Sequence, residues 1–438
     1  MDFRYVADQI AKDIAAGRLV PGERLPTQRR FARERGIALS TAARVYGELV
    51  KRGLVVGEVG RGTYVRAALP RADQSFTEPA THGIDLEFNF PVLPEHAAVL
   101  AESLRRWIKP DMSVDVLRAI GAGGTPEARA AAVRLLARGE WSPRAEDVLF
   151  AGSGREAIAG VLAALVPPGE RLGVETLTYA AVKSIAARLG IVLVPLAMDD
   201  DGVTPDAIQA AGSLRAVYLQ PALHNPLGIS MSAQRRVDVA EVLLAKGIPL
   251  VEDAIYSFLH DDPPLSSLLP DQSVLIDSLS KRIAPGLNLG FVVAGRTLRP
   301  EIGNTIRSGA WGPQRFALAA ATAWITDGTT ERLRADKRTD AAARQRLVAE
   351  HLADQDVRAD PRAYHCWWTL PGSWRAETFV AAAARNGIAI APAAAFAVGT
   401  GRAPHAVRLA LASPPLSALA SALDRLAEIA RGDDLGTE

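Results

Sequence analysis

The fold of this chain is decided by the stretch Ile276-Asp-Ser-Leu-Ser-Lys-Arg-Ile-Ala-Pro-Gly-Leu-Asn-Leu-Gly-Phe291, in which Lys281 lies between an apolar run and a glycine-bounded turn. Apolar residues at 273–276 lead into the stretch and a second apolar run, 289–294, follows it, which is the pattern of buried strands. We therefore expect Lys281 at a strand end beside a cleft. Burial lowers the pKa of an amine and frees the lone pair that attacks an aldehyde. A lone lysine also fits an ordinary surface position, so the neighbouring strands decide between the two.

Two upstream strands end in polar side chains. Residues 248–256 form an apolar run that ends at Asp253 and is followed by the phenol of Tyr256. Residues 217–228 form another short strand, which ends in a polar turn containing Asn225. A pyridoxal 5′-phosphate (PLP) site needs a carboxylate for the ring nitrogen, donors for the ring oxygen and an amine for the aldehyde. Together with the lysine, these strand ends predict a PLP site.

Short apolar strands alternate with helical stretches through the middle of the chain. Helical patterns such as 180–188 and 233–246 separate most of them. Such alternation is typical of a mainly parallel sheet that is covered by helices on both faces and binds its ligand at the carboxyl ends of the strands. The strands are expected near residues 148, 172, 192, 217, 249, 274 and 290.

The ordered set Asn225, Asp253, Tyr256 and Lys281 resembles that of the fold-type-I aspartate aminotransferases, and the resemblance extends from about residue 86 to the C-terminus. It implies an α/β fold with a smaller C-terminal α/β subdomain. It also implies that PLP is the cofactor and that Lys281 is the residue that bonds to its aldehyde.

Further candidates for the cofactor site lie at a helix start and beside the lysine. Ser153, Gly154 and Arg155 follow a strand and open a helix, where main-chain N–H groups can cradle a phosphate. Ser278 and Ser280 are additional donors. By the resemblance, Tyr179 stacks on the cofactor ring, although a core phenol is an alternative.

Arg408 is the candidate for binding the carboxylate of a substrate or effector. An arginine among apolar strand residues is costly to bury without an anion, and its planar fork fits a carboxylate. It matches the arginine that holds the substrate α-carboxylate in the resembled aminotransferases. An internal Asp or Glu partner is the structural alternative.

Two positions depart from the resembled pattern. Asn288 stands where relatives carry an arginine that clamps the cofactor phosphate, and Arg282 or Arg155 is a candidate to supply the missing charge. Ile120 stands where relatives often carry a tyrosine that reaches the neighbouring subunit's site. Because Asn288 lacks the charge of that arginine, we predict weaker, reversible PLP binding. Because of Ile120, we do not expect the tyrosine contact from the neighbouring subunit.

The N-terminal residues 1–66 have the pattern of three helices followed by two short strands. Phe3, Val6, Ile10 and Ile14 recur at helical spacing, a second helix rich in arginine follows, and the third covers 41–52. This order is similar to the winged helix-turn-helix of GntR-type repressors, which share the segments at 25–29 and 60–64.

We expect this module to bind DNA, although a solvated cap or a protein-docking module is the alternative. Small polar side chains and arginines on its second and third helices and at the wing suit base edges and phosphates. The predicted DNA-binding residues are Thr27, Arg29, Arg30, Ser40, Thr41, Arg44, Arg61 and Gly62. Leu39 replaces an arginine that is usual in the family, so base contacts there are left open.

Composition is consistent with a regulator of two domains. Residues 1–66 carry 13 Lys and Arg against 7 Asp and Glu, whereas the whole chain has a net charge of +1. The single cysteine, Cys366, fits a reducing compartment, and the sequence contains neither an export signal nor a membrane-spanning run. We expect a cytoplasmic protein. Residues 67–85 are predicted as a linker and 86–438 as the effector domain; this arrangement resembles the MocR subgroup of GntR regulators.

Three functions remain open from the sequence. The first is a transcription regulator, an expected homodimer, that binds operator DNA and senses PLP, an amine or amino-acid effector, or both. The second is a working aminotransferase with a DNA-binding appendage. The third is a regulator that uses a dead aminotransferase fold only to dimerise. The seven histidines are scattered without metal-ligand spacing, so no metal is expected.

Overall fold

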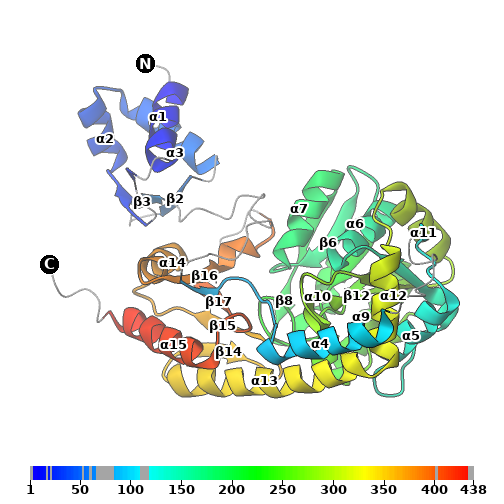
Figure 1. The fold of residues 1–438 in the computed structure, drawn as a ribbon. Helices are drawn as coiled ribbons and strands as arrows, with labels where there is room; N and C mark the ends of the chain where they lie inside the picture. The colour runs from blue at the N-terminus through cyan, green and yellow to red at the C-terminus, as the bar shows by residue number, and fades with distance from the viewer. Residues whose placement is uncertain are drawn as a thin grey trace.

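The computed structural model describes residues 3–15, 18–19, 22–51, 54–58, 62–65, 83–108, 118–399 and 403–432. A small N-terminal module lies beside a much larger α/β body (Figure 1). Within the described ranges, no helix is both long and apolar enough to cross a membrane.

The N-terminal module packs three helices against a three-stranded antiparallel sheet. Its core includes Val6, Phe31, Val45 and Leu49. Thr27 caps the second helix, since its Oγ1 accepts a hydrogen bond from the Arg30 amide at 3.3 Å. The elements are α1 (Phe3–Ala15), β1 (Arg24–Leu25), α2 (Gln28–Arg35), α3 (Leu39–Lys51), β2 (Val55–Glu58) and β3 (Gly62–Val65), with strand order β1-β3-β2.

A seven-stranded sheet forms the centre of the larger body. Every strand runs parallel to the others except β13, which is antiparallel to both of its neighbours. All seven strands predicted from the sequence are present. In spatial order they are β5 (Val148–Ala151), β13 (Gly290–Ala294), β12 (Ser273–Ser278), β11 (Leu250–Asp253), β10 (Ala216–Leu219), β6 (Arg171–Glu175) and β7 (Val192–Leu196).

Helices cover both faces of this sheet. Alternate strand residues point to opposite faces, so Phe291 packs with Leu318 of α12 while the next residue, Val292, packs with Ile306 of α11. The helices are α4 (Pro94–Trp107), α5 (Pro126–Leu136), α6 (Gly154–Leu165), α7 (Ala180–Leu189), α8 (Pro205–Ala210), α9 (Ala233–Lys246), α10 (Leu279–Arg282), α11 (Arg299–Ser308) and α12 (Arg315–Thr326). Short 3₁₀ turns are η3 (Ala145–Asp147), η4 (Ser257–Leu259) and η5 (Leu265–Leu268), and a small hairpin joins β8 (Met198–Asp199) to β9 (Gly202–Val203).

A second sheet of five strands builds the smaller C-terminal subdomain, and the long helix α13 (Thr329–His351) runs beneath both parts (Figure 1). The sheet has the order β14 (Asp356–Ala359), β15 (His365–Thr369), β17 (Ala406–Ala410), β16 (Ile388–Pro392) and β4 (Ile84–Leu86). The remaining elements are α14 (Ala376–Arg385), η6 (Ala393–Ala395) and α15 (Leu416–Arg431).

Strand β4 precedes the whole large sheet in the sequence, yet it is the edge strand of the C-terminal sheet. It pairs in parallel with β16, with Ile84 opposite Ile388. The first two of its three residues fall in the stretch that was predicted as linker, 67–85. The segment that follows β4 is thereby held against the C-terminal subdomain.

The two parts of the chain touch through β3 and α14. The Arg375 guanidinium, at the start of α14, lies 4.6 Å from the centroid of the Tyr64 ring. A Cβ built on Gly22 would lie 3.6 Å from the Cβ of Ala381. The wing side of the N-terminal module therefore contacts the smaller subdomain.

Candidate functional site

Lys281 lies in the four-residue helix α10, directly after strand β12. Its Nζ donates to the carbonyl oxygen of Asn89 and lies 4.7 Å from the centroid of the Phe90 ring. Burial lowers the pKa of Lys281 to about 7, and the positive charges of Arg408 and Arg155 add to the shift. A large share of this amine is therefore neutral near pH 7, as nucleophilic attack requires.

Asp253 is the last residue of strand β11, which lies between β12 and β10 in the sheet. Its Oδ2 accepts hydrogen bonds from the Tyr218 hydroxyl and, at 3.1 Å, from Gln220 Nε2. Its Oδ1 accepts one from the Ile255 amide at 3.1 Å. Burial raises the pKa of Asp253 to about 6, and these hydrogen bonds oppose the rise. The carboxyl group is thus held rigidly by three donors.

Tyr256 follows Asp253 by three residues and is buried. Its hydroxyl accepts a hydrogen bond from Asn89 Nδ2 at 2.9 Å. Burial raises the pKa of Tyr256 to about 12, while the charge of Arg408 opposes the shift. The phenol is therefore protonated at neutral pH and able to donate.

Arg408 lies in the middle of strand β17, among apolar strand residues as the sequence indicated. Its Nη1 donates to Asn225 Oδ1 at 3.1 Å and its Nη2 donates to the carbonyl oxygen of Glu87. The guanidinium lies 5.0 Å from the centroid of the Phe396 ring, and its buried Nε makes no hydrogen bond to the described residues. These partners are an amide and a main-chain carbonyl, not the carboxylate that the structural alternative required.

The N-terminus of α6 meets the end of β12. Ser153 caps the helix by accepting the Glu156 amide at 3.1 Å. A Cβ built on Gly154 would lie 3.0 Å from Ser278 Oγ, so the glycine permits a close approach. Ser278 Oγ lies 2.7 Å from Ser280 Oγ. Two hydroxyls and a helix N-terminus therefore lie together, an arrangement that suits a phosphate, and the phosphate cradle stays a prediction.

Arg155 lies on the first turn of α6 and connects this cradle to Tyr179. Its Nε donates to the Tyr179 hydroxyl at 3.3 Å. Because Arg155 also depresses the pKa of Lys281, its charge acts inside the site. The structure brings together all the residues predicted for the cofactor and carboxylate sites.

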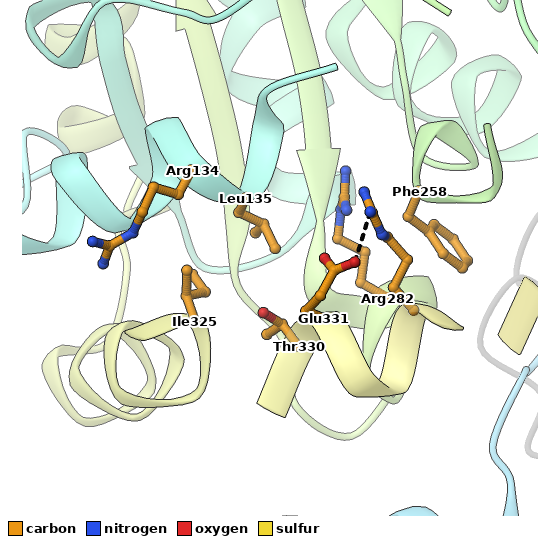
Figure 2. Close-up of a pocket in the computed structure, with 8 residues that line it drawn as sticks. Arg134, Leu135, Phe258, Arg282, Ile325, Thr330 and Glu331 are labelled. Atoms are coloured by element: carbon orange, nitrogen blue, oxygen red, sulfur yellow. Dashed lines mark ion pairs between the residues drawn. The ribbon is translucent and has the colours of Figure 1, made fainter. Parts of the chain in front are cut away.

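Arg282 does not take the place of the missing phosphate-clamping arginine. It is buried, and its Nη2 donates to Asp277 Oδ2 at 2.6 Å and to Ser257 Oγ at 3.1 Å. Its side chain lines a separate hollow with Arg134, Phe258 and Thr330, in which Glu331 pairs with a neighbouring arginine (Figure 2). None of the predicted cofactor residues lines that hollow. Asn288 is exposed. Because Arg282 is bound to Asp277, Arg155 is the remaining candidate for the missing charge.

Several residues that join the site were not anticipated. Tyr218 and Gln220 are at the carboxyl end of β10, the sheet edge where ligands bind, and that rule could have identified them. Asn89 carries no local signal, because its contacts with Lys281 and Tyr256 join positions far apart in the sequence. His224 is also buried next to Asn225, with its Nε2 3.3 Å from Glu175 Oε2.

The N-terminal module presents its predicted DNA-binding residues as follows. Arg29, Ser40 and Arg44 are exposed, and so is Leu39 at 48%. Arg30 is exposed but paired with Glu34 at 2.6 Å. Thr27 is exposed and caps α2, Thr41 is half-buried, Gly62 is half-buried with a φ of 123°, and Arg61 lies outside the described residues.

The fold and the residue set define a helix-turn-helix module joined to an aminotransferase-type domain. The family model for aminotransferase class I and II matches residues 81–426, and the model for the gntR family of bacterial regulatory proteins matches residues 4–65. The chain belongs to the MocR-type transcription regulators, in which a GntR helix-turn-helix is fused to a class I and II aminotransferase domain. The predicted fold class is confirmed.

Two regulators and one enzyme illustrate the similarity. The chain is 31% identical to the uncharacterized HTH-type transcriptional regulator YdeF of Bacillus subtilis (strain 168), over 94% of this chain and 90% of YdeF. It is 25% identical to the vitamin B6 salvage pathway transcriptional repressor PtsJ of Salmonella typhimurium (strain LT2), over 93% and 94% of the two chains. The structure of LysN, an α-aminoadipate aminotransferase from Thermus thermophilus, matches with a TM-score of 0.72 at 20% identity, covering 81% of this chain and 93% of LysN. This last similarity concerns the fold alone.

Proposed function

We propose that this regulator binds PLP at Lys281 and senses PLP, an amino compound, or both, through the effector region predicted at 86–438. The observation that carries the proposal is the half-buried Lys281 amine, with its pKa lowered to about 7, in one site with Asp253, Tyr256 and Arg408. Strongly shifted pKa values within one cluster of residues are typical of sites that act chemically. The name of PtsJ, a repressor of vitamin B6 salvage, supports PLP as the molecule sensed.

The residues present fit PLP. The close approach of Gly154 to Ser278 leaves a cradle with two serine hydroxyls and the start of α6 for the phosphate. Asp253 would pair with the ring nitrogen, and the Tyr256 and Asn225 side chains would hold the ring oxygen. Tyr179 would stack on the ring, and Lys281 would bond to the aldehyde. When bound, PLP supplies an electron-withdrawing ring and an aldehyde that captures amines.

An effector that carries a carboxylate would bind to Arg408. The buried Nε of Arg408 has no partner among the described residues, so the guanidinium has donor capacity left for an anion. Asn225 orients the guanidinium through its Oδ1. An amino acid would then place its carboxylate at Arg408 and its amino group toward the cofactor aldehyde.

Operator DNA would bind to the module predicted at residues 1–66, with 67–85 as the linker. Arg29, Arg30, Arg44 and Arg61 would contact phosphates or base edges, and Ser40, Thr41, Thr27 and Gly62 would lie at the same surface. We further propose a cytoplasmic homodimer that binds two half-sites, since two-fold operators match the symmetry of dimeric regulators.

The test begins with an absorbance spectrum of the purified chain mixed with PLP. Borohydride reduction followed by peptide mass spectrometry should then locate phosphopyridoxyl on Lys281. Lys281→Ala should lose the trapped adduct, whereas Lys183→Ala, at another partly buried lysine, should keep it. An adduct that persists on the Lys281→Ala chain would refute the assignment.

A working aminotransferase is the second candidate. The hydrogen bond between Arg408 and Asn225, beside Lys281, places a carboxylate-binding fork next to a nucleophilic amine, which is the minimum that transamination needs. Formation of a keto acid from a panel of amino acids by the PLP-loaded chain, absent in Lys281→Ala, would favour this function.

A further inference from the structure

One main-chain segment, residues 87–90, accepts hydrogen bonds from both groups that a ligand would use, the Arg408 guanidinium and the Lys281 amine. The carbonyl oxygen of Glu87 accepts a hydrogen bond from Arg408 Nη2, and the carbonyl oxygen of Asn89 accepts one from Lys281 Nζ. The ring of Phe90 lies beneath the same amine at 4.7 Å. The segment therefore spans the distance between the predicted carboxylate site and the predicted aldehyde site.

The side chains of Asp85, Ser413 and Tyr256 hold this segment in place. Asp85 Oδ1 accepts the amides of Glu87 and Phe88 at 2.8 and 2.9 Å, which tightens the turn after β4. Ser413 Oγ donates to the Phe88 carbonyl at 2.6 Å. Asn89 Nδ2 donates to the Tyr256 hydroxyl at 2.9 Å. Four hydrogen bonds thus fix the segment across the site.

We propose that the 87–90 segment is a built-in competitor of the effector, which is displaced when a ligand binds. The inference rests on the proposed function and adds its regulation. A carboxylate at Arg408 competes with the Glu87 carbonyl for the same guanidinium. An aldehyde that bonds to Lys281 removes the amine from the Asn89 carbonyl. Both exchanges act on one short stretch of backbone, so ligand occupancy becomes a change in the position of that stretch.

This position matters because the segment connects the site to the N-terminal module. It follows β4 directly, and β4 begins within the last residues of the predicted linker. The Ile84 amide of β4 donates to the Gly387 carbonyl at 2.8 Å, just after the end of α14. Helix α14 begins beside Arg375, whose guanidinium lies over Tyr64 of the wing. Displacement of the segment therefore reaches the DNA-binding module through β4 and α14.

The competition has a reciprocal consequence. If a ligand must loosen the segment, then loosening the segment by mutation must tighten the ligand. Ser413→Ala removes one anchor without changing Lys281, Arg408 or the cradle. Loss of one hydrogen bond corresponds to about a two- to tenfold change in affinity.

The experiment uses the full chain and N-(5′-phosphopyridoxyl)-L-alanine, a stable compound that carries a phosphate, a ring and a carboxylate. Calorimetric titration should show about two- to tenfold tighter binding to Ser413→Ala than to the natural chain. Ser417→Ala, at an exposed serine of α15, is the matched control and should bind like the natural chain. Equal or weaker binding by Ser413→Ala would overturn the inference.

Hydrogen–deuterium exchange separates this inference from the proposed function. With the probe bound, peptides covering 278–290 should become protected while those covering 84–92 exchange faster. Protection of 278–290 with unchanged or slower exchange at 84–92 would overturn the competitor role and leave PLP binding standing. Unchanged exchange in both regions, with no heat of binding, would overturn both.

Discussion

Lys337 Nζ donates a hydrogen bond to the carbonyl oxygen of Lys281 at 2.8 Å, so a buried lysine positions the backbone of the half-buried Lys281. The same amine donates to the Ile283 carbonyl at 2.7 Å. It thereby satisfies two carbonyls at the end of α10, the short helix that carries Lys281. Lys337 is fully buried, and burial lowers its pKa to about 7, with the charge of Lys281 adding to the shift.

Lys337→Met should therefore loosen α10 and destabilise the fold. Two buried carbonyls lose their donor, at a cost of about 1–3 kcal/mol each. Because the folded-state pKa lies below the ordinary value of 10.5, the unfolded chain binds more protons between about pH 7 and 10.5, and this lysine adds stability as the pH rises. The loss of Tm should thus be larger at pH 9.5 than at pH 7.5. Arg346→Met, at an exposed position on the same helix, is the control. An equal loss of Tm in Lys337→Met at both pH values would contradict the lowered pKa of Lys337.

The rate at which PLP attaches to Lys281 should follow the neutral fraction of its amine. With a pKa of about 7, that fraction rises about tenfold from pH 6 to pH 8 and then levels off. Stopped-flow absorbance at fixed PLP would measure the profile. Arg155→Gln removes a positive charge that depresses this pKa, so the midpoint should move to higher pH. A rate that keeps rising tenfold per pH unit beyond pH 9 would indicate an ordinary exposed lysine.

Asn288→Arg should tighten PLP binding by about one to two powers of ten, because charge-assisted hydrogen bonds to phosphate are worth about 1.5–3 kcal/mol each. Of the two candidates for the missing charge, Arg282 is engaged in an ion pair with Asp277, which leaves Arg155 to compensate in the natural chain. Asn304→Arg, at an exposed asparagine of α11, controls for added charge. If the natural chain retains PLP through exhaustive dialysis and Asn288→Arg binds no tighter, reversible sensing of PLP loses its basis.

The triple change Arg29→Ala, Arg44→Ala and Arg61→Ala should weaken operator binding and flatten its dependence on salt. Each lost phosphate contact lowers the slope of log affinity against log salt by about 1. Fluorescence anisotropy across a salt series measures both quantities. Lys12→Ala, at an exposed site on α1, should change neither by a comparable amount. Full affinity in the triple variant would exclude this surface.

The arrangement of the large sheet could be predicted from the sequence, because strands and helices alternate over a long part of the chain. The seven sheet strands are short apolar runs with helices between them, and period and spacing were enough to predict them. Strands β1, β4, β8 and β9 have two or three residues each, too few to show a period, and only tertiary pairing makes them strands. The site was predictable to the extent that its residues end strands.

The rest of the site depends on contacts between distant parts of the chain. Asn89 reaches Lys281 and Tyr256 because β4 joins the sheet of the C-terminal subdomain, which no local pattern indicates. Lys337 looks like an exposed cation on a polar helix, yet it is buried under α10. Arg282 follows Lys281 directly but bonds to Asp277 and not to the cofactor site, because consecutive residues of a helix face different directions.

In the proposed function, occupancy of the Lys281 and Arg408 site controls DNA binding. This coupling can be measured as the affinity of the full chain for an operator, selected by the chain from random DNA, without and with saturating PLP plus an amino-acid pool. We predict a change of at least about fivefold in the natural chain, the lower end of typical allosteric coupling, and no change in Lys281→Ala. An affinity that ignores PLP and amino acids, or an equal response in Lys281→Ala, would contradict the account.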